Sequence, residues 1–350
     1  MQELIAQGLT VIAIAPFDQE IADELERQKI QFIPIKMERN GMNPFADILF
    51  FLKICKILKK EKIDIIFSYT IKPIIYGSIA AKFSKIQKIY SMVTGTGYIF
   101  LDVNLKNKIV GLIAQKLFKI SLFFNQLVFF QNNDNLNFFR NKKIISSRKP
   151  VAIINGSGVD CELFSPVEYP KKISFLMIAR LLYDKGIREY VAAARMIKKI
   201  YPDVKCKLVG WIDTNPNSIS EQELNEWIQE GSIEFLGKLS DVRPAIAESS
   251  VYVLPSYHEG IPRTVLEAMA MARAIITTNA PGCKETVIHN KNGLLVAVKE
   301  ITGLFKAMEF FILSPEKIHA MGKESRKLAI EKYDVNKVNL SILKAMQLTK

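Results

Sequence analysis

The sequence VYVLPSYHEGIPRTVLEAMA, residues 251–270, sets the architecture of this chain. It begins with a short apolar, β-branched run, Val251–Ser256, which predicts a buried strand. A loop with Gly260 and Pro262 follows, and a helix is expected over residues 264–272. A strand, loop and helix in this order place free backbone N–H groups at the helix start, where an anion can bind.

The same alternation of strands and helices extends outward in both directions. Further strands are expected in the second half over residues 172–182, 205–211, 233–237 and 274–278, and in the first half over 9–16, 30–35, 64–69 and 88–93. Continuous apolar strands separated by helical patterns are typical of parallel sheets covered on both faces. The chain is therefore predicted to be α/β, with two doubly wound, Rossmann-like domains facing a cleft.

The domain boundaries follow from a break in this pattern at SPVEYPK, residues 165–171. We expect an N-terminal domain over residues 1–166, a second domain over 167–334 and a final helix over 335–350 that returns toward the first domain. The first recognisable element is a helix end at Gln2–Gln7, whereas a doubly wound domain normally opens with a strand. Either the fold has lost its first strand or the sequence begins late.

Composition narrows the class of protein. The 350 residues suffice for two domains, and four cysteines without a CxxC pair predict neither a disulfide framework nor a zinc site. The first residues lack the pattern of a signal peptide. We therefore expect a cytoplasmic protein.

The net charge of +13 is concentrated in one region. Between Lys53 and Lys149 there are 18 Lys and Arg residues against four Asp and Glu residues. Such a region attracts polyanions such as anionic lipid or a phosphorylated substrate, and a simply solvated basic surface is the alternative. Residues 109–130 contain lysines and amides and are too polar to span a membrane. They predict an amphipathic helix, either packed in the domain or lying on a membrane surface, followed by a strand.

Several enzyme classes are excluded by missing motifs. The closest approach to G-x-G-x-x-G, at Gly95 and Gly97, has Phe100 in place of the third glycine, and no P-loop or G-x-S-x-G segment occurs. The three histidines are not spaced as metal ligands, and there is no D-x-D pair. These absences disfavour a dehydrogenase, a P-loop NTPase, a metalloprotease and a hydrolase, and no metal or other cofactor is expected.

Two carboxylates lie eight residues apart in the opening segment. Glu259 falls in the loop before the predicted helix, and Glu267 lies about one turn inside it. Both could accept hydrogen bonds from sugar hydroxyl groups. The alternative is that they only complement the helix dipole, with Glu267 in solvent.

This spacing resembles the E-x7-E signature of the retaining GT-B glycosyltransferases called GT4. Three further segments agree in order, namely NGSGVD at residues 155–160, ARLLYDKG at 179–186 and IEFLGKLSD at 233–241. They resemble the hinge, the R…K-G diphosphate motif and the loop that borders the nucleobase. The resemblance covers nearly the whole chain and implies transfer from a nucleotide sugar with retention at the anomeric carbon.

The resemblance also implies roles for individual residues. Arg180 and Lys185 would grip the donor diphosphate and Glu259 would lie near the donor sugar, so these three are the catalytic candidates. Glu267 would bind the ribose. The remaining donor-binding candidates are Gly260, Ile261, Pro262, Arg263, Gly210 and Leu236.

The acceptor half resembles a branch that acts on undecaprenyl-diphosphate-linked sugars in bacterial glycan assembly. The similarity lies in SYTIKPIIYG, residues 68–77, and MVTGTGYIF, residues 92–100. The acceptor-side candidates are Thr94, Gly95, Thr96, Gly97 and Lys72. The two glycines permit close backbone approach, or mark an ordinary turn, and Lys72 either meets an acceptor phosphate or is solvated.

The resemblance thus predicts a hexosyltransferase that moves a hexose or N-acetylhexosamine from a nucleotide sugar, with UDP as the expected nucleotide, to a lipid-diphosphate-linked glycan. The enzyme is expected to be cytoplasmic and peripherally bound to the inner face of an anionic cell membrane. Three alternatives remain. One is a truncated, inactive remnant that binds nucleotide or membrane, and another is a UDP-sugar epimerase of the same fold. The third, nucleic-acid binding, rests on charge alone, and no nucleic-acid partner is expected.

Overall fold

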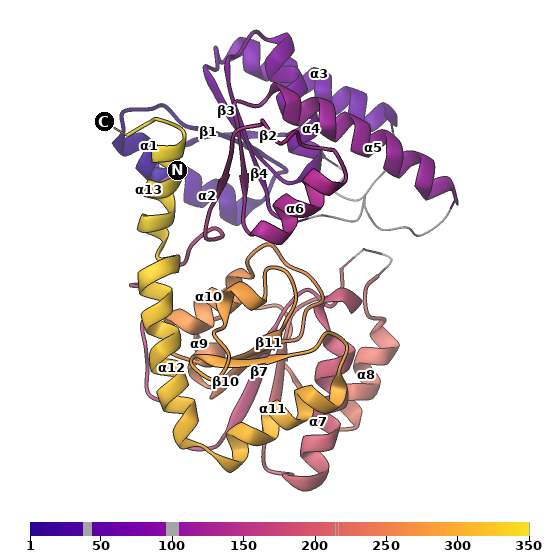
Figure 1. Ribbon diagram of the computed structural model, residues 1–350, viewed down its shortest axis with the longest axis vertical. Coiled ribbons are helices and arrows are strands. Elements are labelled where there is room, and N and C mark those ends of the chain that lie inside the picture. The colour runs from indigo at the N-terminus through magenta and orange to yellow at the C-terminus, as the bar shows by residue number, and fades with distance from the viewer. Residues whose placement is uncertain (38–43, 96–104, 214, 216, 350) are drawn as a thin grey trace. The chain divides into compact units, whose positions relative to one another are not determined.

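A computed structural model describes residues 1–37, 44–95, 105–213, 215 and 217–349, with the side chains of residues 105–110 left out of the description. The chain forms two compact units, one of residues 1–154 with 339–350 and the other of residues 155–338 (Figure 1). The first of the two segments that make up the first unit ends at Ile154, twelve residues before the boundary at residue 166 that the sequence suggested.

Residues 155–166 pack in the second unit through polar contacts. The N–H of Val159 donates to the Tyr333 carbonyl at 2.8 Å. The Arg326 guanidinium donates to the carbonyls of Cys161 and Phe164 at 2.8 and 3.0 Å. These bonds join the segment to the end of the second unit, which explains why the composition break at residues 165–171 does not coincide with the structural division.

The first unit contains a four-stranded parallel sheet in the order β3-β4-β5-β6 and a separate parallel pair, β1-β2. The strands are β1 (Ile12–Ala15), β2 (Gln31–Pro34), β3 (Ile65–Tyr69), β4 (Lys88–Val93), β5 (Leu127–Phe130) and β6 (Val151–Ile153). The helices are α1 (Gln2–Ala6), α2 (Gln19–Arg27), α3 (Pro44–Lys60), α4 (Ile71–Phe83), α5 (Leu105–Phe124) and α6 (Asn133–Asn141). Among the described residues no strand joins β1 to β3.

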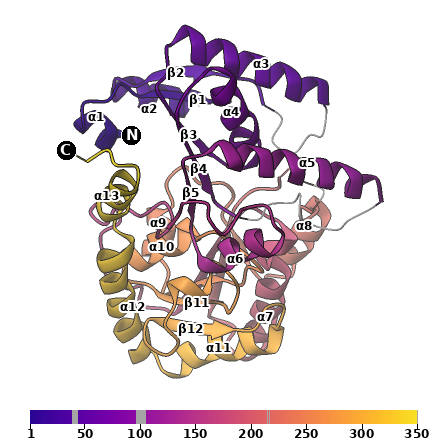
Figure 2. The same cartoon turned by 45° about the horizontal axis from the view of Figure 1, so that its top comes forward.

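Alternate residues of β4 face opposite sides of this sheet, as the period of a strand requires. Ile89 and Val93 pack with the helices α3 to α6, whereas Tyr90 and Met92 pack with the final helix, α13 (Val335–Ala345). Figure 2 shows α3 and α5 on either side of α4. The predicted helix and strand within residues 109–130 are confirmed as α5 and β5.

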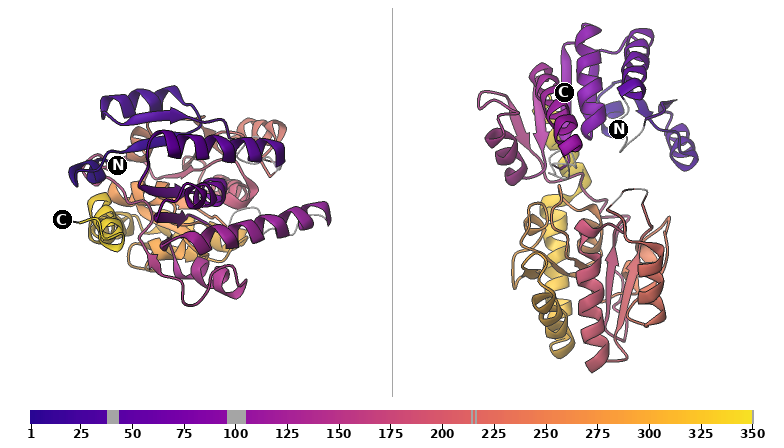
Figure 3. Two further views of the ribbon diagram at one scale, coloured as in Figure 1. Left: turned by 90° about the horizontal axis from the view of Figure 1, so that it is seen from above. Right: turned by 90° about the vertical axis from the view of Figure 1, so that its right-hand side faces the viewer.

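The second unit is a doubly wound domain with one six-stranded parallel sheet in the order β12-β11-β10-β7-β8-β9. The strands are β7 (Ser174–Ile178), β8 (Lys205–Val209), β9 (Glu234–Phe235), β10 (Val251–Leu254), β11 (Ala274–Thr278) and β12 (Gly293–Val296). The helices are α7 (Ile187–Ile200), α8 (Glu221–Gln229), α9 (Arg243–Ala247), α10 (Arg263–Ala270), α11 (Ile301–Leu313) and α12 (Glu316–Leu328). Figure 3 shows the helices on both sides of the sheet, which explains why strands such as β7 and β10 are buried along their whole length.

Candidate active site

The predicted donor-side residues gather where the strand order of the second unit reverses. From β7 the chain moves outward through β8 and β9, and it then returns to β10 on the other side of β7. Loops that leave two such neighbouring strands in opposite directions open a crevice at their carboxyl ends, which is where ligands bind in doubly wound folds. Arg180 and Lys185 follow β7, and Glu259 follows β10, so the predicted catalytic residues flank this switch point.

Lys185 and Glu259 form an ion pair across the switch point. The Lys185 Nζ lies 2.6 Å from the Glu259 Oε1, and both side chains are largely buried, with exposed fractions of 15% and 16%. Lys185 ends the short 3-10 turn η2 (Tyr183–Lys185), and Gly186 follows with φ +73°. A Cβ at Gly186 would lie 2.2 Å from the Pro255 carbonyl oxygen. Only glycine permits both this conformation and this close approach.

Backbone hydrogen bonds hold the loop that carries Glu259. The N–H of Tyr257 and the hydroxyl of Ser256 both donate to the carbonyl of Asp184, at 2.8 and 3.1 Å. The N–H of Glu259 donates to the Pro281 carbonyl at 2.9 Å. The loop after β10 is therefore tied to the turn after β7 and to the loop after β11, which keeps the Glu259 carboxylate beside Lys185.

Arg180 pairs with a residue that the sequence reasoning missed. Its Nη1 donates to the Oδ2 of Asp213 at 3.0 Å, and Asp213 lies in the segment after β8. Nearby Trp211 is 43% exposed, and the Lys238 Nζ lies 5.6 Å from the centre of its ring. An aspartate and a tryptophan directly after a buried strand were the signal that could have revealed this part of the site.

The other two donor-side candidates of this region, Gly210 and Leu236, are held by backbone hydrogen bonds. The N–H of Gly210 donates to the Gly237 carbonyl at 2.9 Å, and a Cβ at Gly210 would lie 2.1 Å from the Ala179 carbonyl oxygen. The N–H of Leu236 donates to the Leu208 carbonyl at 2.9 Å. Their close packing brings the ends of β7, β8 and β9 together.

Glu267 lies inside α10 and is not solvated. Its carboxylate accepts a hydrogen bond from the Nε of Arg263 at 2.9 Å, and its side chain is only 8% exposed, against 73% for Arg263. Burial raises the pKa of Glu267 above its usual 4.5, and the nearby Arg263 charge opposes this rise. The alternative of a solvated Glu267 is therefore wrong, whereas its predicted place about one turn inside the helix is confirmed.

Gly260, Ile261 and Pro262 form the connection between the Glu259 loop and the start of α10. A Cβ at Gly282 would lie 2.2 Å from the Gly260 carbonyl oxygen, so the loop after β11 packs directly against this connection. Pro262 is the residue before the helix and gives it no side-chain cap. The start of α10 thus keeps backbone donors for an anion, as the sequence suggested.

Three cations of the second unit are therefore each held by a carboxylate, in the pairs Lys185–Glu259, Arg180–Asp213 and Arg263–Glu267. Fixed cations can stabilise the charge of a leaving diphosphate, and the carboxylates can accept hydrogen bonds from sugar hydroxyls. Among the described residues no group of His, Cys, Asp and Glu side chains is arranged to hold a metal ion.

The acceptor-side candidates belong to the first unit. Thr94 and Gly95 directly follow β4 and are half-buried, and a Cβ at Gly95 would meet no atom of the described residues within 4 Å. Thr96 and Gly97 lie outside the described residues. Lys72 is only 9% exposed, and its Nζ donates to the Oδ1 of Asp47 at 2.7 Å. The suggestion that Lys72 is solvated is therefore wrong, because this ion pair fastens α4 to α3.

Comparison with protein families agrees with this architecture. Residues 161–328 match the model of "Glycosyl transferases group 1", and residues 1–132 match "Glycosyl transferase 4-like". The two matches together span most of both units.

Similar proteins of known name come from bacteria. The chain is 31% identical, over 95% of its length and 90% of the relative, to the N,N'-diacetylbacillosaminyl-diphospho-undecaprenol alpha-1,3-N-acetylgalactosaminyltransferase of Campylobacter jejuni. It is 25% identical, over 83% of its length and 77% of the relative, to an Escherichia coli UDP-Gal:alpha-D-GlcNAc-diphosphoundecaprenol alpha-1,3-galactosyltransferase.

Solved structures share the fold. A glycosyltransferase from Rickettsia africae has a TM-score of 0.76 at 22% sequence identity. The match covers 100% of this chain and 93% of the Rickettsia chain. The Anabaena protein Alr3699/HepE, solved with UDP-glucose, has a TM-score of 0.78 at 18% identity, covering 99% and 94%. Together with the identity to the Campylobacter transferase, these matches show that the chain belongs to the GT4 family of glycosyltransferases and has the GT-B fold.

Proposed function

We propose that this protein is a retaining hexosyltransferase that moves a hexose or N-acetylhexosamine from a UDP-sugar to a lipid-diphosphate-linked glycan. The observation that carries the proposal is the pairing of Arg180 and Lys185 with Asp213 and Glu259 at the carboxyl ends of β7, β8 and β10. The names of the Campylobacter and E. coli relatives support a diphosphate-linked lipid acceptor.

The donor diphosphate is proposed to bind at the switch point of the second unit. Arg180 and Lys185 would contact its oxygens, together with the backbone donors at the start of α10. In the free protein both cations are already oriented by carboxylates, so little side-chain freedom would be lost on binding. Charge that develops on the leaving diphosphate would be stabilised without a metal ion.

The two glutamates would then have different tasks. Glu259, beside Lys185, is proposed to lie near the donor sugar, where its second oxygen can accept from a hydroxyl group. Glu267 is proposed to accept hydrogen bonds from the ribose, since Arg263 and the first turn of α10 fix its orientation. Gly210 and Leu236 would border the nucleobase at the ends of β8 and β9.

The acceptor is proposed to bind the first unit at the carboxyl end of β4, where Thr94 and Gly95 lie. No atom of the described residues would meet a Cβ at Gly95, which supports a close approach of a substrate to the backbone there. Lys72 is proposed to hold α4 against α3 rather than to contact an acceptor phosphate directly. Its ammonium group already forms an ion pair with the Asp47 carboxylate, which also accepts a hydrogen bond from Tyr76.

An anionic membrane surface is the further partner that we propose. Apolar side chains project into solvent from two helices, with Ile48, Leu49 and Leu52 on α3 and Leu112, Ile113 and Phe123 on α5. Exposed lysines such as Lys56 and Lys116 lie among them. Apolar and basic residues mixed on one surface are typical of helices at a membrane interface. Among the described helices none is long and apolar enough to cross a bilayer.

The membrane proposal is tested by sedimentation with vesicles of phosphatidylcholine that contain phosphatidylglycerol. Ile113→Ser combined with Phe123→Ser should lower the bound fraction, because two exposed apolar groups are lost. Leu313→Ser in the second unit removes an apolar group that is 67% exposed and serves as the control. Equal binding of the double variant and the wild type would contradict the proposal.

The catalytic proposal is tested first by calorimetric titration with UDP, and with GDP as a control, without added metal. UDP is expected to bind and GDP to bind much more weakly. Transfer is then measured with labelled UDP-sugars and undecaprenyl-diphosphate-linked acceptors, and the anomeric configuration of the product is read by NMR. UDP binding without any transfer would favour an inactive relative, whereas an inverted product would contradict the assigned reaction.

A further inference from the structure

A second basic feature of the first unit lies away from the candidate acceptor side. It is a surface pocket of about 390 Å³ lined by Lys119, Arg140, Lys143, Ile145, Ser146 and Ser147. Lys119 belongs to the last turns of α5, Arg140 lies near the end of α6, and the other residues form the turn that follows α6. We call these six residues the α6 pocket.

The α6 pocket lies at the amino ends of the strands of the four-stranded sheet. Helix α6 begins just after the carboxyl end of β5 and runs back, so the turn after it lies beside the start of β6. Helix α5 likewise ends just before the start of β5. Thr94 and Gly95 follow the carboxyl end of β4 and therefore lie at the opposite end of the strands. A ligand in the α6 pocket would thus be separate from a sugar acceptor bound at Thr94 and Gly95.

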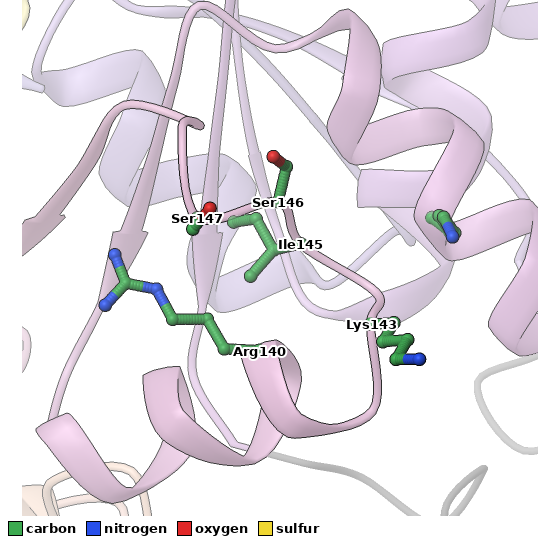
Figure 4. Close-up of a pocket in the computed structure, with 6 residues that line it drawn as sticks. Arg140, Lys143, Ile145, Ser146 and Ser147 are labelled. Atoms are coloured by element: carbon green, nitrogen blue, oxygen red, sulfur yellow. The ribbon is translucent and has the colours of Figure 1, made fainter.

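The turn after α6, which carries most of the pocket residues, is anchored in the core by Ile144 and Ile145. Ile144 and Ile145 are buried and pack in one cluster with Phe118 of α5 and Phe139 of α6. The N–H of Ile144 donates to the Phe139 carbonyl at 3.0 Å. The polar residues that follow are therefore carried on a turn whose backbone is held by buried side chains. Figure 4 shows Ile145 between the Arg140 and Lys143 side chains, with Ser146 and Ser147 beside it.

The cations of the α6 pocket have no acidic partner in the part of the chain that the structure describes. Among the described residues Lys119, Arg140 and Lys143 form neither an ion pair nor a side-chain hydrogen bond, unlike Arg195, which is held by Glu230 at 2.7 Å. Between Asp102 and Asp160 the only acidic residue in the sequence is Asp134. Figure 4 shows Arg140 and Lys143 on opposite sides of Ile145, so these cations border the pocket rather than meet at one point, and their charge makes the pocket complementary to a negatively charged group.

Neutral donors complete the site. Ser146 and Ser147 line the α6 pocket, and the Ser146 Oγ accepts a hydrogen bond from the N–H of Arg148 at 3.3 Å. The backbone N–H groups of Ser146 and Ser147 donate to no acceptor within the described part of the chain. Arginine and lysine cations, hydroxyl groups and free N–H groups are the donors that proteins use for phosphate oxygens.

We propose that the α6 pocket binds a phosphate group, carried either by a phospholipid head group or by a small soluble phosphate. The site goes beyond the proposed sugar transfer and uses none of the donor-side residues. Exposed Ile120 and Phe123 follow Lys119 on α5, so a lipid phosphate in the pocket would have apolar side chains beside it for its glycerol and acyl region. A soluble phosphate would need only the polar residues.

The test uses the full chain and the double variant Arg140→Gln/Lys143→Gln. Its matched control is Lys171→Gln/Lys172→Gln, which removes two exposed charges without an ion pair from the second unit. One arm measures sedimentation with phosphatidylcholine vesicles with and without phosphatidylglycerol. The other arm measures calorimetric binding of inorganic phosphate and of glycerol 3-phosphate. Melting temperature and UDP affinity are measured for every variant, and both should stay unchanged.

The pocket variant is expected to bind the anionic vesicles about thirtyfold more weakly, because each basic residue near an anionic surface contributes about 1 kcal/mol. The control variant should change little. Loss in the vesicle arm alone identifies a lipid head group, and loss in both arms identifies a site that also accepts soluble phosphate. The proposal is overturned if neither probe binds, or if the pocket and control variants lose equal affinity, since charge alone would then explain binding. UDP binding remains a separate readout, so failure here leaves the transferase proposal untouched.

Discussion

The donor side of the second unit and the α6 pocket of the first unit hold their positive charge in opposite ways. In the second unit Arg180, Lys185 and Arg263 each contact a carboxylate, whereas in the first unit Lys119, Arg140 and Lys143 have no such partner among the described residues. A cation that must meet one substrate in one geometry benefits from a neighbour that fixes its rotamer. Unpaired cations on a surface attract any anion that fits. On the basis of this difference we propose that the donor side of the second unit serves a defined reaction and that the α6 pocket meets less specific anionic partners.

The largest effect is expected when a donor-side cation is removed. Arg180→Ala and Lys185→Ala should each lower turnover by roughly 100- to 1000-fold, since loss of one group that stabilises transition-state charge has this effect. Turnover is measured as UDP release with saturating acceptor. Arg195→Ala breaks an ion pair with Glu230 on the outer helices and should leave the rate unchanged. Near-normal rates in both site variants would refute the diphosphate assignment.

The buried pair of the first unit should instead matter for stability. Lys72→Met leaves the Asp47 carboxylate without its cation and is expected to lower the free energy of unfolding by about 3 kcal/mol. Urea denaturation measures this change. Lys72→Met with Asp47→Leu should recover much of the loss, because no uncompensated charge then remains. If the double variant is as unstable as the single one, the ion pair is not the cause. A rate loss in a stable double variant would point to direct acceptor contact.

Glu267 tests the ribose assignment. Glu267→Ala should weaken UDP binding by roughly tenfold to a hundredfold, as expected when a charged acceptor that makes hydrogen bonds worth about 1.5–3 kcal/mol is lost. Calorimetric titration gives the Kd. Glu300→Ala, at the start of α11, is the control carboxylate and should bind UDP normally. An unchanged Kd for Glu267→Ala would remove Glu267 from the site.

The smallest expected effect is a pH dependence of UDP affinity. Burial raises the pKa of Glu267 above 4.5, so its carboxylate takes up a proton at a higher pH than an exposed glutamate. Affinity should be highest above this raised pKa and fall as the pH is lowered through it. In Glu267→Gln, which cannot titrate, the component of the pH profile that belongs to Glu267 should disappear. A profile identical to that of the wild type would assign the pH dependence to another group.

Local patterns were sufficient for much of the fold. The apolar runs that predicted β7, β8, β10 and β11 are strands of one parallel sheet, and residues 109–130 form a helix and a strand as expected. The ordered elements after residue 278, β12, α11 and α12, were not anticipated. The boundary differs because residues 155–166 are held by Arg326 and Tyr333, which lie far away in the sequence. No local pattern records such a contact.

Some residues of the candidate site were predicted from the sequence, whereas their contacts with distant segments were not. Glu259, Glu267, Arg180 and Lys185 were named through the resemblance of their motifs to the GT4 family, and Arg180, Lys185 and Glu259 follow strands that meet at the switch point of the sheet. Asp213 follows a buried strand, but its pairing with Arg180 was not predicted, because that contact depends on β8 lying next to β7. The burial of Lys72 was also missed, because its partner Asp47 lies 25 residues earlier on another helix.

By itself the sequence determined the alternation of strands and helices, the E-x7-E segment and the uneven charge, because each depends on neighbouring residues and their chemistry. Only the tertiary structure decided which carboxylate holds each of the donor-side cations, that Glu267 is buried, and that Lys119, Arg140 and Lys143 line one pocket with no acidic partner among the described residues. The physical reason is that ion pairing and desolvation depend on distance in space, and strand order brings distant segments together.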